Sequence, residues 1–179
     1  KSVTDALAAG KSSANLPVGA SGPQLLRWDP YQDEWVLEGP IDDELCKFLA
    51  EAVELSATPR GSTSLRDQAQ TVRYFVPYLE HSNRQIADSA HAKLASAPYS
   101  ALREVAAELD REKLLTWIQS QQTAINRRSA LYVTLLGICG NEDTRDIIRS
   151  WIVRPWTGGD SGFLAAVLTA HIELEGEPA

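Results

Sequence analysis

Two apolar stripes joined by a short polar turn fill residues 64–97, and this pattern constrains the fold most strongly. On both sides of the turn, apolar side chains recur at three- and four-residue steps, the spacing of one face of an α-helix. The first stripe is Leu65, Ala69, Val72, Val76 and Leu79, and the second is Ile86, Ala90, Leu94 and Ala97. Between them, Ser82 and Asn83 are residue types that cap helices. The segment predicts two short antiparallel helices.

Pro77 lies inside the first of these helices. A proline in a helix interior costs about 3 kcal/mol because it lacks an N–H group and clashes with the preceding turn. We therefore expect the first helix to bend at this residue.

The order of proline and apolar residues in this segment resembles the helix pairs of HEAT-repeat (ARM-type) α-solenoid proteins. The matching residues are Pro77, Leu79, Ile86, Ala87, Ala90 and Leu94. Ser82 and Asn83 stand where the family usually has an aspartate, and Ala87 stands in its arginine position. The resemblance implies an all-α fold, a short right-handed α-solenoid, in which the second helix of each pair lines a concave binding surface.

Two further helix pairs can be placed downstream. Residues 100–140 supply a second pair, whose first helix is broken near Asp110, and residues 141–174 supply a third. The second helices of the three pairs start near Asn83, Asn126 and Ser161, a spacing of about 35 to 43 residues that suits two-helix repeats. We predict about three antiparallel helix pairs over residues 64–179.

The amino-terminal part has a different pattern. Residues 1–24 are rich in Ala, Ser and Gly and predict a flexible tail or linker. Residues 25–40 predict a small hairpin-like or irregular segment, with Trp28 and Trp35 opposite each other. Residues 41–57 predict a helix that caps the first helix pair, and residues 25–179 together predict a single domain.

Charge and hydropathy exclude two classes of partner. A net charge of −7 disfavours nucleic acid, because the phosphate backbone would be repelled. The longest apolar run, residues 132–140, is far shorter than the roughly 20 residues that cross a bilayer, so we expect a soluble protein without membrane insertion. The compartment is not indicated, and export after removal of an amino-terminal signal is an open alternative.

The chain lacks the sequence motifs of common catalytic and metal sites. It has no HExxH, clustered CxxC, glycine-rich phosphate loop or GxSxG motif, and its three histidines lie in different segments. Cys46 and Cys139 lie in separate predicted helices, so we expect no disulfide, and Cys139 is expected in the core. We predict no catalytic residue, cofactor or metal ligand.

The remaining candidates are polar and aromatic residues on the predicted second helices and on one loop. We predict a protein or peptide partner at these residues: Gln85, Asp88, Arg127, Arg128, Tyr132 and Trp156. Other interpretations stay open, with the arginines as solvated ion-pair partners and Trp156 as a lid over the last helix pair. The domain could also be a structural or assembly module, although the polar ending ELEGEPA favours a capped end. An enzyme with a site between repeats is a third class, and the oligomeric state is not indicated.

Overall fold

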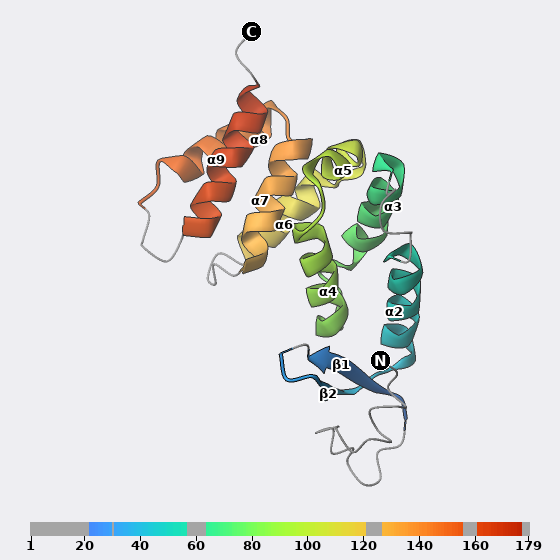
Figure 1. The fold of residues 1–179 in the computed structure, drawn as a ribbon. Coiled ribbons are helices and arrows are strands. Elements are labelled where there is room, and N and C mark those ends of the chain that lie inside the picture. The colour runs from blue at the N-terminus through green and yellow to red at the C-terminus, as the bar shows by residue number, and fades with distance from the viewer. Residues whose placement is uncertain (1–21, 30, 57–63, 121–126, 156–160, 177–179) are drawn as a thin grey trace. The chain divides into compact units, whose positions relative to one another are not determined.

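The computed structural model describes residues 22–29, 31–56, 64–120, 127–155 and 161–176. Within these ranges the chain is mostly helical, with one antiparallel pair of strands near its amino-terminal end (Figure 1). A mostly helical fold preceded by a small β segment is therefore confirmed. The predicted tail lies outside the described part of the chain up to residue 21. None of the described helices has the length and apolar character needed to cross a lipid bilayer.

The chain divides into two compact units, residues 1–55 and 56–179. In the first unit, β1 (Gln24–Asp29) pairs with β2 (Glu34–Pro40), and Trp28 faces Trp35 in the register, as predicted. The Asp29 carboxylate accepts hydrogen bonds from the two amides that follow in the turn, which closes the hairpin. The prediction of one domain over residues 25–179 stays a prediction.

Helix α2 (Asp43–Ser56) completes the first unit. It starts where the Asp42 carboxylate accepts a hydrogen bond from the Leu45 amide at 2.7 Å, so Asp42 satisfies a donor that the first turn leaves open. Leu45 and Phe48 are buried. The predicted helix over residues 41–57 is confirmed, whereas its role as a cap on the first helix pair stays a prediction.

The second unit opens with the helix pair that the apolar stripes predicted. Helix α3 (Leu65–Phe75) begins with a reciprocal capping box between Ser64 and Asp67. The chain then tightens into the 3₁₀ helix η1 (Val76–Tyr78), so the bend expected at Pro77 takes the form of a change in helix type. Helix α4 (Arg84–Ala95) starts at Asn83, whose side chain accepts a hydrogen bond from the Gln85 amide.

The next predicted helix is divided into three short pieces. They are α5 (Tyr99–Glu104), the 3₁₀ helix η2 (Ala106–Glu108) and α6 (Arg111–Ser120). The division between η2 and α6 occurs at Asp110, which caps α6 by accepting a hydrogen bond from the Lys113 amide at 3.0 Å. The break near Asp110 is confirmed, and α5 is an additional helix before it that packs against α3 and α7.

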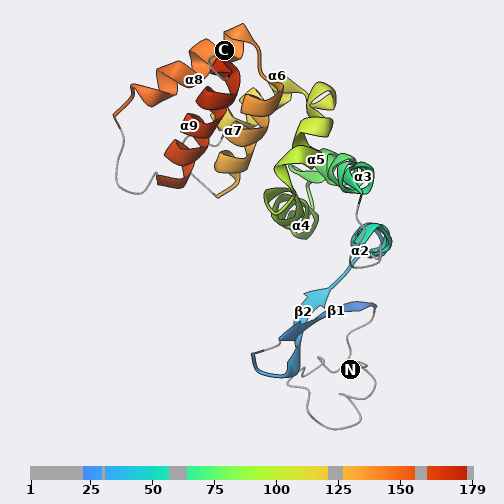
Figure 2. The same cartoon turned by 45° about the horizontal axis from the view of Figure 1, so that its top comes forward.

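Three longer helices complete the second unit: α7 (Arg127–Cys139), α8 (Glu142–Ile152) and α9 (Ser161–Glu175). Helices α7 and α9 lie side by side in both views, with α8 next to α9 (Figures 1 and 2). Helix α7 is covered over most of its surface, and its buried residues are Ser129, Leu131, Tyr132, Val133, Leu135 and Leu136. The core of the second unit is therefore built around α7.

Gly137 allows α7 and α9 to approach closely. A Cβ atom at this position would lie 2.6 Å from both Cα and Cβ of Ala170, closer than real side chains come. Two small residues thus meet where the two helices touch, and any side chain at Gly137 would push the helix backbones apart.

We expect Gly137→Ala to destabilise the protein by about 1 to 3 kcal/mol, because the added methyl overpacks the α7–α9 contact. Urea denaturation monitored by circular dichroism measures this change. Gly162→Ala is the control, since a Cβ there meets no atom within 4 Å. That variant should gain stability by about 0.5 kcal/mol through helix propensity. Equal stability of the two variants would contradict the close approach of α7 and α9.

Candidate functional site

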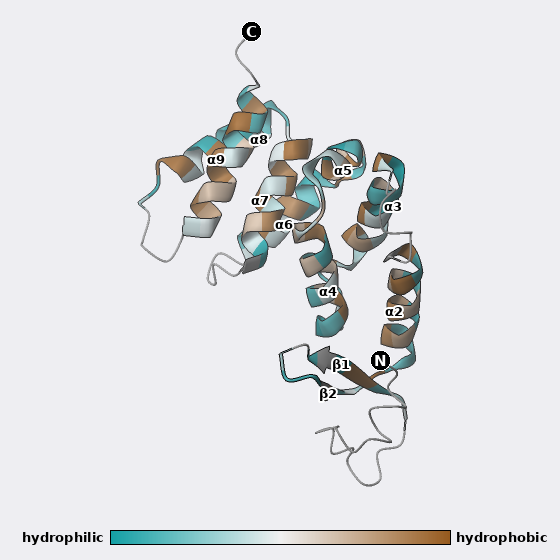
Figure 3. Ribbon diagram, viewed as in Figure 1, coloured by the Kyte–Doolittle hydropathy of each residue, from teal (hydrophilic) through white to brown (hydrophobic). Residues whose placement is uncertain are grey.

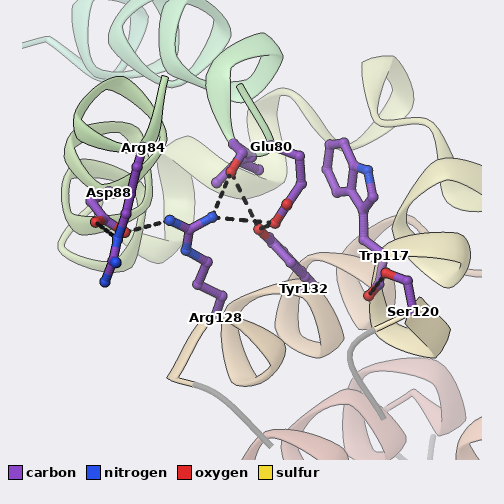
Figure 4. Close-up of polar contacts among 8 residues, drawn as sticks. Glu80, Arg84, Asp88, Trp117, Ser120, Arg128 and Tyr132 are labelled. Carbon is purple, nitrogen blue, oxygen red and sulfur yellow. Dashed lines mark hydrogen bonds and ion pairs between the residues drawn. The ribbon is translucent and has the colours of Figure 1, made fainter. Parts of the chain in front are cut away.

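The most developed polar cluster of the second unit surrounds Arg128 at the start of α7 (Figure 4). Its guanidinium contacts residues about one predicted repeat earlier in the chain. There, Nη2 donates a hydrogen bond to Asp88 on α4. Nη1 lies 3.6 Å from the Glu80 carboxylate and 3.5 Å from the carbonyl oxygen of Leu79, just after η1. One side chain therefore joins α7 to α4 and to the turn before α4.

Tyr132 lies one helical turn after Arg128 and completes the cluster from the interior. Its ring is fully buried, and its hydroxyl donates a hydrogen bond to Glu80. The ring packs against Trp117, with ring centres 5.3 Å apart, and meets the His91 ring edge-on at 6.5 Å. Glu80 is thus held by a phenol from one side and a guanidinium from the other.

Two effects set the pKa values of these side chains: their charges act on one another, and burial removes water from them. The hydrogen bond from Arg128 holds the pKa of the Asp88 carboxyl below its ordinary value of 3.8, although partial burial acts in the opposite direction. Burial raises the pKa of the Tyr132 hydroxyl, and the bond to Glu80 raises it further. Burial is the largest single effect on Arg128 and opposes its charge, but the hydrogen bond to Asp88 and the nearby negative charges together outweigh burial, so the Arg128 pKa is raised. Arg128 is therefore charged and Tyr132 is a neutral hydrogen-bond donor.

The outer edge of the cluster is exposed. Arg84 is 90% exposed, and its Nε lies 3.3 Å from the second oxygen of Asp88. Asp88 is itself 53% exposed, and Gln85, next to Arg84 on α4, is exposed too. We call the surface formed by Arg84, Gln85, Asp88 and Arg128 the α4–α7 face. It presents both charges and an amide, chemistry that suits recognition of polar protein groups.

The structure brings together three of the six predicted partner-binding residues. Asp88, Arg128 and Tyr132 form one network, but Tyr132 supports it from beneath instead of reaching solvent. Gln85 lies next to the network on α4. The side chain of Arg127 and all of Trp156 lie outside the described residues. Among the residues that are described, no group of three or more His, Cys, Asp or Glu side chains could hold a metal ion.

Sequence reasoning missed Glu80, the residue on which Arg128 and Tyr132 converge. The sequence did contain a signal for the pair formed by Asp88 and Arg128, because these residues carry opposite charges and lie 40 residues apart. That separation is about one repeat, and residues one repeat apart are neighbours when helix pairs stack. No comparable sequence pattern links Glu80 to Tyr132. The polar residues before α4 indicate only a helix cap.

Comparison with known proteins adds no assignment: no protein-family model, curated protein or solved structure matches this chain.

We expect Asp88→Asn to lower the free energy of unfolding by about 0.5 to 1 kcal/mol near neutral pH, a small value because the pair is partly exposed. The contribution of Asp88 is complete above its ordinary pKa of 3.8. It is lost as the pH falls through the lower pKa of the folded state, because the carboxyl then becomes neutral. Wild type and variant should therefore converge by about pH 2 in urea denaturation. A difference that persists unchanged there would contradict the ion pair, and Arg84→Gln is the control with little expected effect.

Cys139, expected in the core, is half-buried at the end of α7. Both described cysteines are free, and burial raises the pKa of the Cys139 thiol to about 11. In a Cys46→Ser variant, the remaining thiol should react with a disulfide reagent at about pH 8 roughly 100-fold more slowly than after unfolding, because so little thiolate is present. Absorbance of the released reagent measures both rates, and equal rates would contradict the burial of Cys139.

Proposed function

We propose that this protein binds a protein or peptide partner, without catalysis, through the α4–α7 face. The observation that carries the proposal is the Arg128 network, which joins α4, α7 and the turn at Glu80 into one surface. In the same proposal, α3–α4, α6–α7 and α8–α9 are successive pairs of a HEAT-like right-handed α-solenoid. Their second helices α4, α7 and α9 line the side that such proteins use for binding.

Pre-organisation is the physical reason that this network favours recognition. A binding surface made of long charged side chains loses affinity when those side chains must be ordered during association. Arg128 is only 19% exposed and is already held by Asp88 and Glu80. Its charge and that of Asp88 are therefore presented in a defined geometry before a partner arrives, which reduces the entropy lost on binding.

The charges also indicate how binding should respond to salt. Arg84, Asp88 and Arg128 place both signs of charge side by side on the α4–α7 face. A partner that complements them would associate faster at low ionic strength and lose affinity as salt screens the charges. Such a dependence distinguishes this mode of binding from association of apolar surfaces.

Arg84 is the best residue for a test of this face. Arg128 is a poor choice because its removal would take the cation away from the partly buried Glu80 carboxylate and from Asp88. Arg84 is 90% exposed, so Arg84→Glu reverses a charge on the face with little effect on the core. Arg66→Glu is a matched control, since Arg66 is an exposed arginine in the first turn of α3.

We expect a partner captured from a native extract by the wild-type chain to be retained by Arg66→Glu and lost by Arg84→Glu. Titration of that partner should show a roughly tenfold weaker affinity for Arg84→Glu, because a like charge replaces a complementary one. Quantitative mass spectrometry of the captured proteins and calorimetry make the measurement. Equal binding by all three proteins would exclude the α4–α7 face.

A second candidate function, an assembly module, is favoured by one observation on α9. Its outward surface exposes Leu168 and Ile172, at 43% and 69%, instead of the polar residues expected on a terminal capping helix. The expectation that the polar ending ELEGEPA caps this end stays a prediction.

A further inference from the structure

Arg84 lies at the outer edge of the α4–α7 face, and part of its guanidinium is open to solvent. The chain of ion pairs in this cluster starts at Glu80 and ends at Arg84 (Figure 4). Arg84 contacts Asp88 through Nε, at 3.3 Å. Within the described part of the chain, its two terminal nitrogens, Nη1 and Nη2, make no hydrogen bond or ion pair. Both are therefore available to a ligand, on a side chain that is 90% exposed.

The carboxylates of the same cluster already have donors. Oδ1 of Asp88 accepts a hydrogen bond from Arg128, and Oδ2 accepts one from Arg84. The Tyr132 hydroxyl and the Arg128 guanidinium both contact the Glu80 carboxylate. Each of the two carboxylates thus has donors from this chain, whereas Nη1 and Nη2 of Arg84 have no acceptor from it. The group that a ligand can add to this face is an acceptor.

The balance of charge at the exposed edge is positive. Two guanidinium groups, those of Arg84 and Arg128, flank the single carboxylate of Asp88. Helix α4 begins at Arg84 and has no acidic residue in its first turn, so the partial positive charge of the helix end adds to that of the side chain. Figure 3 shows hydrophilic ribbon, in teal, at this end of α4. The edge therefore attracts an anion more strongly than a cation.

The negative charge of the chain is unevenly distributed. The net charge is −7, but most of the acidic excess lies in residues 1–55. Residues 56–179, the unit that contains α4 and α7, have nearly equal numbers of acidic and basic residues. Exposed charges separated by more than about 8 Å are largely screened at physiological salt. The local charges of the α4–α7 face therefore govern which ligand approaches it.

The geometry of Arg84 suits a carboxylate. The terminal N–H groups of a guanidinium form a planar fork that matches the two oxygens of a carboxylate, so both oxygens can accept a hydrogen bond at once. The contact between Nε and Asp88 restrains the fork before a ligand arrives, which reduces the entropy lost on binding. In a protein or peptide ligand, aspartate and glutamate side chains supply such carboxylates.

We propose that the partner bound at the α4–α7 face presents an acidic segment, and that Arg84 holds one aspartate or glutamate carboxylate of this segment through Nη1 and Nη2. This inference rests on the proposed function, because it names the chemistry of the partner at the same surface. Arg84 is then the residue that determines specificity. Arg128 and Tyr132 act beneath it by holding the carboxylates of Asp88 and Glu80 in place.

Titration of the full chain with two decapeptides, acetylated and amidated at their ends, tests the ligand. One peptide alternates Glu with Ser and the other alternates Lys with Ser, so the two differ in the sign of their side-chain charge. We expect the Glu peptide to shift the NMR signals of the amides in the first turn of α4 and of the Arg84 Nε–H group. Its dissociation constant should be about 1 mM and should rise with salt. The Lys peptide should leave these signals nearly unchanged.

Three variants assign the contact to Arg84. Arg84→Gln should weaken binding of the Glu peptide roughly three- to fivefold, because the charge and the fork are both lost. Arg84→Lys should weaken it roughly twofold, because the charge stays but the bidentate geometry is lost. Arg66→Gln is the matched control, an exposed arginine in the first turn of α3, and should bind like the wild type. Both arginines are exposed, so circular dichroism should be unchanged in all three variants.

The outcomes separate this proposal from the proposed function. Affinity for the Glu peptide that falls from wild type to Arg84→Lys to Arg84→Gln, with Arg66→Gln unchanged, supports the proposal. The proposal is overturned if the Glu peptide leaves the α4 signals in place or the Lys peptide shifts them more strongly. It is also overturned if Arg84→Gln or Arg84→Lys binds as well as the wild type.

Each overturning result leaves the proposed function to be decided by the capture experiment. A partner that the wild type captures and Arg84→Glu loses would then bind the α4–α7 face through other chemistry, so the proposed function would stand without an acidic ligand. Equal capture by the wild type and Arg84→Glu would exclude the face itself, and both proposals would fail.

Discussion

Burial of α7 is the constraint on which the second unit depends. This helix is apolar over most of its length, so it needs cover from several directions at once. The elements that pack against α7 include α4, α5, η2, α6 and α9. Gly137 lets α7 and α9 approach so closely that no side chain fits between them at that position. The arrangement of the surrounding helices therefore follows from what α7 must bury.

The Arg128 network is the polar consequence of that packing. Once α7 lies against α4, its first turn faces the carboxylates of Glu80 and Asp88, which need a cation as they lose water. Tyr132 adds a neutral donor from the buried side. The same contacts that hold two helices together leave ordered charges at the surface, so a structural role and the proposed recognition role coincide in one cluster. This coincidence is the reason that Arg84 probes recognition more cleanly than Arg128.

The two proposed surfaces differ in their physical character. The α4–α7 face is charged and pre-organised, which suits selective and salt-sensitive recognition. On α9 the exposed Leu168 and Ile172 are apolar, and burying them would stabilise an assembly through the hydrophobic effect. The two proposed roles therefore depend on different residues. The two activities would then be separable by mutation.

Local signals in the sequence were sufficient to predict most of the helices and the hairpin. The cap at Asn83 acts within three residues along the chain, so its meaning can be derived without knowledge of the fold. The break at Asp110 has the same local origin. By contrast, the convergence of Arg128 and Tyr132 on Glu80 joins residues about 50 positions apart. Only the packing of α7 against its neighbours decides which side chains meet over such a distance, because no local pattern links residues that far apart in the sequence.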